Sequence, residues 1–249
     1  MNCKEEDLRT ASVLGCSAVE RLAKARVAVF GVGGVGGALC EALARSGVGS
    51  IDLFDGDCVS RSNLNRQIIA LQSTVGQKKV DVMCARIRDI NPDCCVKTHH
   101  VFYLPENADE YPLEGYDYIA DAIDTVSAKL ELIKRAKAQG IPIISSMGTG
   151  NKLDPTLFEV TDLSKTQGCP LARVMRRELK AVGITHLKVL FSPEPPVPLP
   201  EDAPVGERKG SYRAPGSLSF VPPVAGYIMA GQIVRDLVAD PCSPKNEDK

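Results

Sequence analysis

Residues 26–55 have the sequence RVAVFGVGGVGGALCEALARSGVGSIDLFD, in which two short apolar runs flank a glycine-rich turn and a helical segment. Short runs rich in β-branched residues are typical of buried strands, and ALCEALAR has the periodicity of a helix. This order predicts a βαβ unit with parallel strands. Further strands are expected near residues 96–99, 116–120 and 141–145, with helices near 76–90 and 126–139. The expected fold is α/β: a Rossmann-like, doubly wound, mainly parallel sheet.

Beyond Met147 the alternation becomes less regular. Strands are expected near residues 157–160 and 187–191, and helices near residues 170–182 and 225–238. Between residues 192 and 216, proline, glycine and charged residues dominate, a composition that predicts a mobile loop. The polar tail after residue 238 is expected to fray.

The composition limits the possible classes of function. The chain has 249 residues, 44% of them hydrophobic, and a formal net charge of −1. Such a balance gives no global field that would gather nucleic acid, so any RNA contact must be a local patch. The nine cysteines include only one close pair, Cys94 and Cys95, and the spacing provides neither a disulfide framework nor a zinc site. A reducing cytoplasm fits this pattern best.

The sequence favours no membrane segment. The N-terminus, MNCKEEDLRTAS, is polar and acidic and lacks the apolar core of a signal peptide. The longest apolar stretch, Val221 to Val238, is interrupted by prolines, glycines, Gln232 and Arg235, which argues against a lipid span.

The glycine-rich turn predicts a nucleotide site. The absence of side chains lets the backbone turn tightly and lets its amides approach a phosphate, and these glycines are Gly31, Gly33, Gly34 and Gly36. Asp55 ends the second strand, where an acidic side chain can accept hydrogen bonds from ribose hydroxyls. The alternative is that the glycines serve only the packing of helix against sheet.

Polar residues after the second strand favour ATP over a nicotinamide cofactor. They are Asn63, Asn65, Arg66 and Gln67, followed by Lys78 and Lys79 at the expected helix start. Attack of a carboxylate on an α-phosphate concentrates negative charge, which fixed cations and magnesium stabilise. Arg66 and Lys79 fit this role. A solvated helix start with surface charges is the alternative.

Two aspartates follow the fourth expected strand. Asp121 and Asp124 lie where ligands of open α/β sheets gather, and one of them can hold magnesium against the phosphates. An aspartate that caps the next helix is the alternative.

Three segments together resemble the ThiF/MoeB branch of the ubiquitin-activating-like enzymes: GVGGVGGALCEALARSGVGSIDLFDGDCVSRSNLNRQ, VGQKKVDVMCARIRDINP and DAIDTVSAKLELI. Within that branch the chain is most similar to the tRNA threonylcarbamoyladenosine dehydratases, through RTASVLG, VTDLSKTQGCPLARVMRRELK and SLSFVPPVAGYIMAG. The resemblance implies one adenylating domain over residues 1–249. Its nucleotide-binding core would span about residues 20–150, and a smaller substrate-binding extension would span about residues 151–240.

The resemblance also assigns roles to residues. ATP would be held by the four glycines and Asp55, together with Asp57, Asn65 and Gln67. Asn63, Arg66 and Lys79 would contact phosphates, and Asp124 would be linked to magnesium. Arg9 matches an N-terminal arginine that relatives extend into the partner subunit's ATP site, which implies a homodimer. The implied reaction is ATP-dependent cyclisation of threonylcarbamoyladenosine in tRNA through an acyl adenylate.

The sequence departs from its relatives that activate ubiquitin-like proteins in two ways. It lacks their two Cys-x-x-Cys pairs, so no structural zinc is expected. Residues 192–216 contain no cysteine, so a covalent thioester step is not expected either. Cys169, before Pro170 at a helix start, is a weaker candidate for a reactive thiol.

The helix expected from Pro170 carries a possible tRNA contact. Arg173, Arg176, Arg177 and Lys180 share one face, while Leu171, Val174, Leu179 and Val182 are expected on the opposite, buried face. The basic stripe would be extended by Lys165, Lys188, Arg208, Lys209 and Arg213, with Tyr212 available to stack on a base. A plain solvated face is the alternative.

Three rival functions remain open from sequence. One is an adenylyltransferase for a sulfur-carrier protein, and another is a nicotinamide-binding oxidoreductase. The third is a nucleotide-binding scaffold that recruits a partner such as a cysteine desulfurase and turns nothing over.

Overall fold

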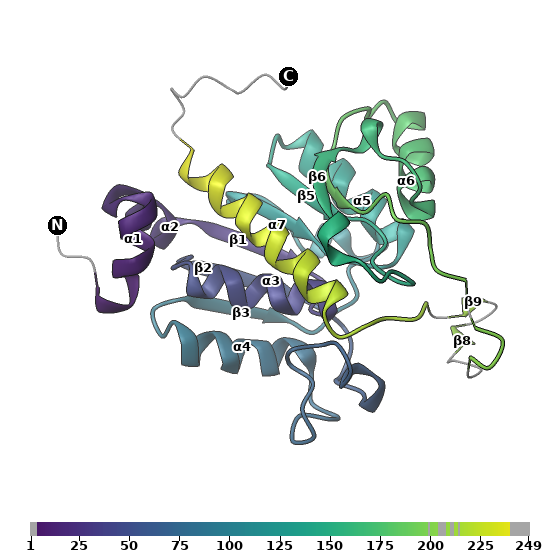
Figure 1. Cartoon of the computed structure of the whole chain (residues 1–249). Helices are drawn as coiled ribbons and strands as arrows, with labels where there is room; N and C mark the ends of the chain where they lie inside the picture. The colour runs from purple at the N-terminus through teal and green to yellow at the C-terminus, as the bar shows by residue number, and fades with distance from the viewer. Residues whose placement is uncertain (1–3, 199, 204–207, 210–211, 214, 240–249) are drawn as a thin grey trace.

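The computed structural model describes residues 4–198, 200–203, 208–209, 212–213 and 215–239 (Figure 1). A seven-stranded sheet crosses the molecule in the order β3-β2-β1-β4-β5-β7-β6. Its strands are β1 (Arg26–Phe30), β2 (Ser50–Phe54), β3 (Cys95–His99), β4 (Tyr118–Asp121), β5 (Ile143–Ser146), β6 (Glu159–Asp162) and β7 (Lys188–Phe191). All pairs are parallel except β6 with β7. The expected doubly wound, mainly parallel sheet is confirmed.

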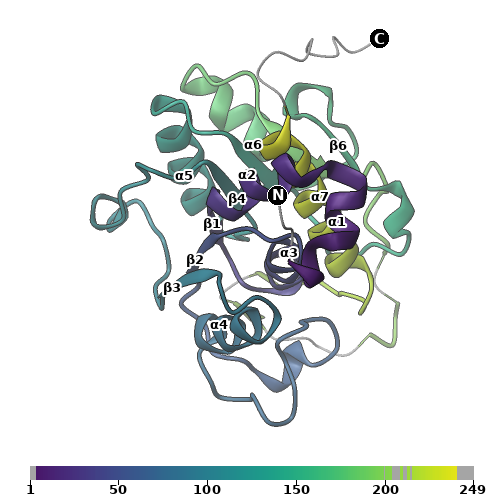
Figure 2. The ribbon, with the colours of Figure 1, turned by 90° about the vertical axis from the view of Figure 1, so that its left-hand side faces the viewer.

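Helices cover both faces of the sheet (Figures 1 and 2). They are α1 (Leu8–Leu14), α2 (Cys16–Lys24), α3 (Gly34–Arg45), α4 (Lys79–Ile90), α5 (Val126–Ala138), α6 (Pro170–Ala181) and α7 (Val221–Val238). One hydrophobic cluster joins the sheet to α2, α3, α4 and α7, and a second joins it to α5 and α6. Residues of β1 alternate between these clusters, with Val27 and Val29 in the first and Ala28 and Phe30 in the second. This alternation is the two-residue period of a strand buried on both sides.

Strand order places the ligand edge of the sheet. The chain runs outward from β1 through β2 to β3 and then returns to β4 on the other side of β1. The carboxyl ends of β1 and β4 therefore form the switch point at which α/β sheets bind ligands. The extension expected after residue 151 adds β6 and β7 to the same sheet.

Several expected boundaries were wrong. The helix expected from residue 76 begins at Lys79. Gly76 still belongs to the loop after β2, because its backbone N–H donates to the carbonyl oxygen of Val59. The last helix begins at Val221 and not at Ala225. Pro222 and Pro223 fit its first turn, where backbone N–H groups have no intrahelical partner. Helices α1 and α2 were not expected at all.

The proline-rich segment is partly described. Arg208–Lys209 (β8) and Tyr212–Arg213 (β9) form a two-stranded antiparallel ladder. Residues 199, 204–207, 210–211 and 214 and the tail 240–249 lie outside the described residues. The expected mobility of residues 192–216 therefore stays a prediction. Among the described helices, none is both long enough and apolar enough to cross a membrane.

Candidate active site

The glycine-rich turn between β1 and α3 has no room for side chains at its two ends. Gly31 has a φ of +90°, and a Cβ there would lie 2.6 Å from the carbonyl oxygen of Ala122. A Cβ on Gly36 would lie 1.8 Å from the carbonyl oxygen of Gly31. At Gly33 the nearest atom to a Cβ would be Nε2 of Gln67, at an ordinary 3.7 Å. No side chain caps α3, so its N-terminus can offer amide groups to an anion.

Gly34 lies at the start of α3 and packs against α7. A Cβ at this position would lie 2.9 Å from Cβ of Pro222. The first turn of α3 thus packs closely against a segment almost 190 residues later in the chain. The sequence motif and the C-terminal helix together shape the glycine-rich turn.

Asp55 follows β2 and organises the glycine turn. Its carboxylate accepts hydrogen bonds from the backbone N–H of Val32 at 2.7 Å and of Asp57 at 2.8 Å. A carboxylate has about four lone-pair positions, so these two bonds leave capacity for a ribose hydroxyl. The ribose contact stays a prediction.

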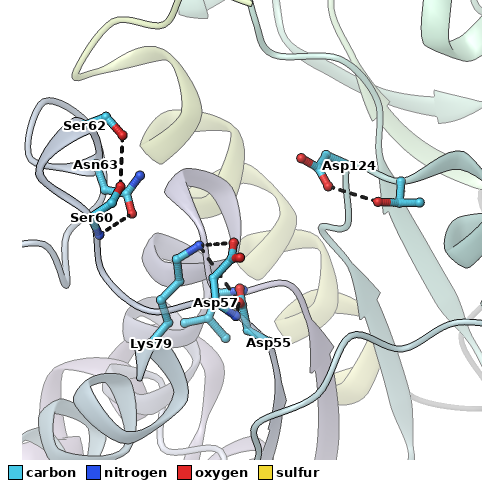
Figure 3. A network of polar contacts seen from close by, with 9 residues as sticks. Asp55, Asp57, Ser60, Ser62, Asn63, Lys79 and Asp124 are labelled. Carbon is cyan, nitrogen blue, oxygen red and sulfur yellow. Dashed lines mark hydrogen bonds and ion pairs between the residues drawn. The ribbon is translucent and has the colours of Figure 1, made fainter. Parts of the chain in front are cut away.

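Lys79 points from the start of α4 toward the end of β2 (Figure 3). Its Nζ lies 2.8 Å from Oδ2 of Asp57 and 3.9 Å from Oδ1 of Asp55. The Lys79 side chain is 6% exposed and that of Asp57 is 43% exposed. The site therefore holds a buried cation whose nearest partner lies at the surface.

The loop after β2 is held by its own polar side chains. Oδ1 of Asn63 accepts from the backbone N–H of Ser60 at 3.1 Å, within a capping box. Arg66 donates to the carbonyl oxygen of Ser62 at 2.9 Å and to Oδ1 of Asn65 at 3.0 Å. Asn63, Asn65 and Arg66 are thus brought together with one another, and no described contact joins Arg66 to Lys79.

Two more residues of this loop, Asn65 and Gln67, lie near other parts of the candidate site. Nδ2 of Asn65 donates to the carbonyl oxygen of Ser217 at 2.9 Å, which ties the loop to the segment before α7. Gln67 is buried beside Gly33, and its Oε1 has no hydrogen-bond partner among the described residues. A buried acceptor without a partner is costly, so this atom suits a donor from a bound nucleotide.

The two aspartates after β4 have different surroundings. Asp121 is fully buried and bonded to Lys129 and Ser145, so it is not available to a metal ion. Asp124 is exposed, and its only described contact is a 3.4 Å hydrogen bond from Oγ1 of Thr125. The helix-cap alternative does not hold for Asp124, because α5 has Thr125 at its N-cap and no side-chain cap bond.

Asp124 fits a magnesium ion that arrives with ATP. Such an ion needs only one or two carboxylates, because phosphates and waters supply its other ligands. Among the described residues, no three His, Cys, Asp or Glu side chains gather as a metal site of their own. The absence of structural zinc stays a prediction.

Sequence reasoning missed two buried residues at this edge, Lys129 and Ser145. Lys129 occupies the apolar stripe of α5, in register with Leu132, Ile133 and Ala136. A lysine at such a position is the sequence signal that predicts a buried charge pair, because lysine is almost never fully buried unless paired.

A third missed residue is Lys152, which follows β5. It is buried, donates to the backbone carbonyl of Glu194, and has its pKa lowered by burial. Burial disfavours the charged amine.

Helix α6 presents part of the expected basic stripe. Arg173, Arg177 and Lys180 are exposed, and Arg177 pairs with the neighbouring Glu178 at 2.6 Å. Arg176 is half-buried and donates to the carbonyl oxygens of Leu163 and Thr166, so it is less available than its neighbours, and its role in a tRNA patch stays a prediction. The Arg176 side chain turns back toward the loop before α6, where it supplies a hydrogen-bond donor to these two backbone carbonyl oxygens.

The rest of the predicted surface is also corrected in part. Val182 is 55% exposed, and the buried face consists of Ala172, Met175 and Leu179. Lys188 pairs with Asp236, which neutralises it, whereas Lys165 is exposed. The side chains of Arg208, Lys209, Tyr212 and Arg213 lie outside the described part of the chain. Cys169 is buried at the N-cap of α6.

Arg9 is exposed on α1 and is not brought to the site of its own chain. The preceding turn packs at the amino edge of the sheet, where Asp7 approaches Gly47 and Lys4 pairs with Asp93. The glycine turn lies at the opposite edge (Figure 1).

Comparison with known proteins identifies the family of this chain. The model of the ThiF family matches residues 6–247. The tRNA threonylcarbamoyladenosine dehydratase of Bacillus subtilis (strain 168) is 47% identical over 239 residues, which cover 93% of this chain and 94% of that protein. The tRNA threonylcarbamoyladenosine dehydratase of Escherichia coli (strain K12) is 37% identical over 247 residues, with 92% of each chain covered.

A solved structure has the same fold. The crystal structure of the E. coli dehydratase TcdA in complex with ATP matches with a TM-score of 0.84 at 36% identity, covering 94% of this chain and 93% of that chain. The chain therefore belongs to the ThiF family and, within it, to the tRNA threonylcarbamoyladenosine dehydratases.

Proposed function

We propose that this chain catalyses the ATP-dependent dehydration of threonylcarbamoyladenosine in tRNA, the reaction for which its relatives are named. The observation that carries the proposal is the cluster of Lys79, Asp55 and Asp57 beside the uncapped start of α3. A buried cation and free amide groups suit a triphosphate, and Asp124 lies on the loop at the switch point.

In the first step the threonyl carboxylate attacks the α-phosphate, forming an acyl adenylate and releasing pyrophosphate. Lys79 and Arg66 stabilise the charge that develops on the phosphoryl oxygens. Arg66 reaches the phosphates after leaving its bonds to Ser62 and Asn65, and Asn63 assists it. The glycine turn, Asp55, Asp57, Asn65 and Gln67 form the nucleotide pocket. Asp124 would hold a magnesium ion that accompanies ATP, and such an ion would neutralise charge on the phosphates.

In the second step the ureido group of the same modified nucleoside attacks the activated carbonyl and closes a ring. One carboxylate oxygen leaves on AMP, so the product has lost one water. The nucleophile is already tethered at a high effective concentration, which removes the need for a cysteine acceptor. The buried state of Cys169 agrees with this assignment.

The tRNA contact is proposed on α6. Arg173, Arg177 and Lys180 are exposed and are separated by four and three residues, so they share one face of the helix. Such a stripe suits the phosphate backbone and needs no strongly basic protein. A cytoplasmic location follows from this proposed substrate.

A homodimer is proposed from α1. Arg9 has no role in its own chain's site, and the same helix exposes 52% of Leu8 and 83% of Val13. Exposed apolar side chains beside a cation suit a partner subunit whose ATP site receives Arg9. A sulfur-transfer partner of the cysteine-desulfurase type stays a prediction on which no described contact bears.

The test is mass spectrometry of nucleosides from tRNA that carries the linear modification, after incubation with the protein, magnesium and ATP. We expect a product lighter by one water, formed with one AMP per conversion. Omission of ATP and a tRNA without the modification are the controls. AMP release that requires a Gly-Gly-ended carrier protein instead of tRNA would favour the sulfur-carrier alternative. ATP binding without any AMP release would favour the scaffold.

A further inference from the structure

A charged network without solvent exposure lies beneath the loop that follows β4. Nζ of Lys129 lies 2.9 Å from Oδ2 of Asp121, and both side chains are fully buried. Oγ of Ser145, also fully buried, donates to the same carboxylate oxygen at 2.6 Å. The three residues come from α5, β4 and β5.

This network is not the arrangement that stability alone favours. Taking both an amine and a carboxylate out of water carries a large desolvation penalty, and well-packed apolar residues of similar volume often serve as well or better. Position 129 continues the apolar stripe of α5, in which Leu132 and Ile133 already pack against the sheet. The charges therefore call for an explanation beyond packing.

The hydrogen bonds of the network end on the backbone of the loop. Oδ1 of Asp121 accepts from the N–H of Ile123 at 3.1 Å, and Nζ of Lys129 donates to the carbonyl oxygen of Ile123 at 3.0 Å. Both polar groups of one residue are thus fixed from inside the protein. The next residue in the chain is Asp124.

The same loop supports the glycine turn. The N–H of Ala122 donates to the carbonyl oxygen of Phe30 at 2.8 Å, immediately before Gly31. The carbonyl oxygen of Ala122 occupies the space where Gly31 would carry a Cβ, 2.6 Å away. A shift of residues 122–123 would therefore move the phosphate-binding turn and the Asp124 carboxylate relative to each other.

We propose that Lys129 is a positioning residue of the nucleotide site, acting with Asp121 and Ser145. It fixes the distance between the glycine turn and Asp124 without touching the nucleotide. The inference rests on the proposed function only in giving Asp124 a role in adenylation. The effect of Lys129 on the backbone of residues 122–123 does not depend on the substrate.

The test compares three variants with the wild type: Lys129→Met, the double variant Asp121→Asn/Lys129→Met, and Lys134→Met. Lys134 lies on the same helix and pairs with Glu131 at the surface, so its variant is the matched control. Melting temperature, ATP affinity by calorimetry, AMP release and hydrogen exchange of peptides containing residues 122–125 are measured for each.

Lys129→Met leaves a buried carboxylate without its cation, so it should lower the melting temperature strongly. The double variant removes that carboxylate charge and should recover most of the melting temperature. It lacks the bond from Lys129 to the carbonyl oxygen of Ile123, however, so exchange at residues 122–125 should remain faster than in the wild type. The kcat for AMP release should remain about tenfold below that of the wild type, with a smaller change in the KM for ATP. The Lys134→Met control should match the wild type throughout.

A double variant with wild-type melting temperature, exchange and kcat would overturn the proposal, because Lys129 would then serve stability alone. If the double variant does not fold, Ser145→Ala tests the same network by removing one hydrogen bond. We expect faster exchange at residues 122–125 and a kcat about threefold lower, and no change in either contradicts the proposal. If even the wild type converts no tRNA, the proposed function fails, while exchange and ATP affinity still test Lys129.

Discussion

Two lysine–aspartate pairs lie at the carboxyl edge of the sheet, and they differ in their access to water. Lys79 and Asp57 meet beyond β2 at 2.8 Å, with side chains that are 6% and 43% exposed. Lys129 and Asp121 meet beyond β4 at 2.9 Å, with both side chains fully buried. Chemistry and distance are almost the same in the two pairs.

We propose that burial gives the two pairs different functions. Asp57 lies at the surface and can return to water, so a phosphate can replace it beside Lys79. Asp121 has no such path, because releasing it would leave an uncompensated charge in the interior. We therefore assign ligand binding to the pair beyond β2 and the positioning of the backbone to the pair beyond β4.

A variant at Lys79 is expected to have the largest effect on activity and to test the difference between the two pairs directly. Lys79→Gln should lower the kcat for AMP release about 10²- to 10³-fold, as expected for loss of a fixed donor to a transition state. Its unfolding free energy should change by about 1 kcal/mol only, because Asp57 can be solvated and Asp55 keeps its hydrogen bonds from the N–H groups of Val32 and Asp57. Lys78→Gln, at the exposed neighbouring position, is the control. Strong destabilisation of Lys79→Gln at normal activity would show that Lys79 serves stability and not ligand binding.

The glycine turn between the two pairs gives a second test. Gly33→Ala should fold normally, since its Cβ meets only an ordinary 3.7 Å contact, but should weaken ATP binding about tenfold by keeping phosphates from the amides. Gly31→Ala faces Ala122 on the buried side and should instead unfold at a much lower temperature. Calorimetric ATP titration and thermal melts separate the two effects. Equal loss of stability in both variants would contradict the distinction.

Helix α6 extends the comparison to exposed cations, for which a smaller effect is expected. Arg173→Glu/Arg177→Glu should weaken tRNA binding about tenfold at low salt, with a difference that shrinks as salt rises and with unchanged ATP affinity. Lys24→Glu/Lys137→Glu changes the net charge equally on other exposed positions. Filter binding over a salt series measures both. Equal weakening by the two double variants would rule out a specific patch on α6.

Much of the fold could be predicted because local patterns repeat along the chain. The apolar runs of β1 and β2 and the glycines between them suffice for a βαβ unit, and Asn91–Pro92 marks the end of α4. The start of α4 could not be predicted, because the long loop after β2 is held by contacts such as that between Asn65 and Ser217, far apart in sequence. Helices α1 and α2 were missed because their short apolar faces depend on packing against the rest of the molecule.

The site was predicted in its components and not in its assembly. The order of strand, glycine turn and acid places Gly31 and Asp55 together, since that order alone brings their backbones to one edge of a parallel sheet. Whether Arg176 faces solvent or the carbonyls of Leu163 and Thr166 depends on a loop that sequence periodicity does not describe.

By itself, the sequence determined the α/β alternation, the edge of the sheet at which a nucleotide site is proposed, and the chemical types available there. The tertiary structure alone decided which of the charged residues keep contact with water. Lys129, Asp121 and Ser145 meet only because α5 packs over β4 and β5, which excludes solvent from all three. The free energy of a charge depends on its surroundings far more than on its neighbours along the chain, so their roles follow from packing.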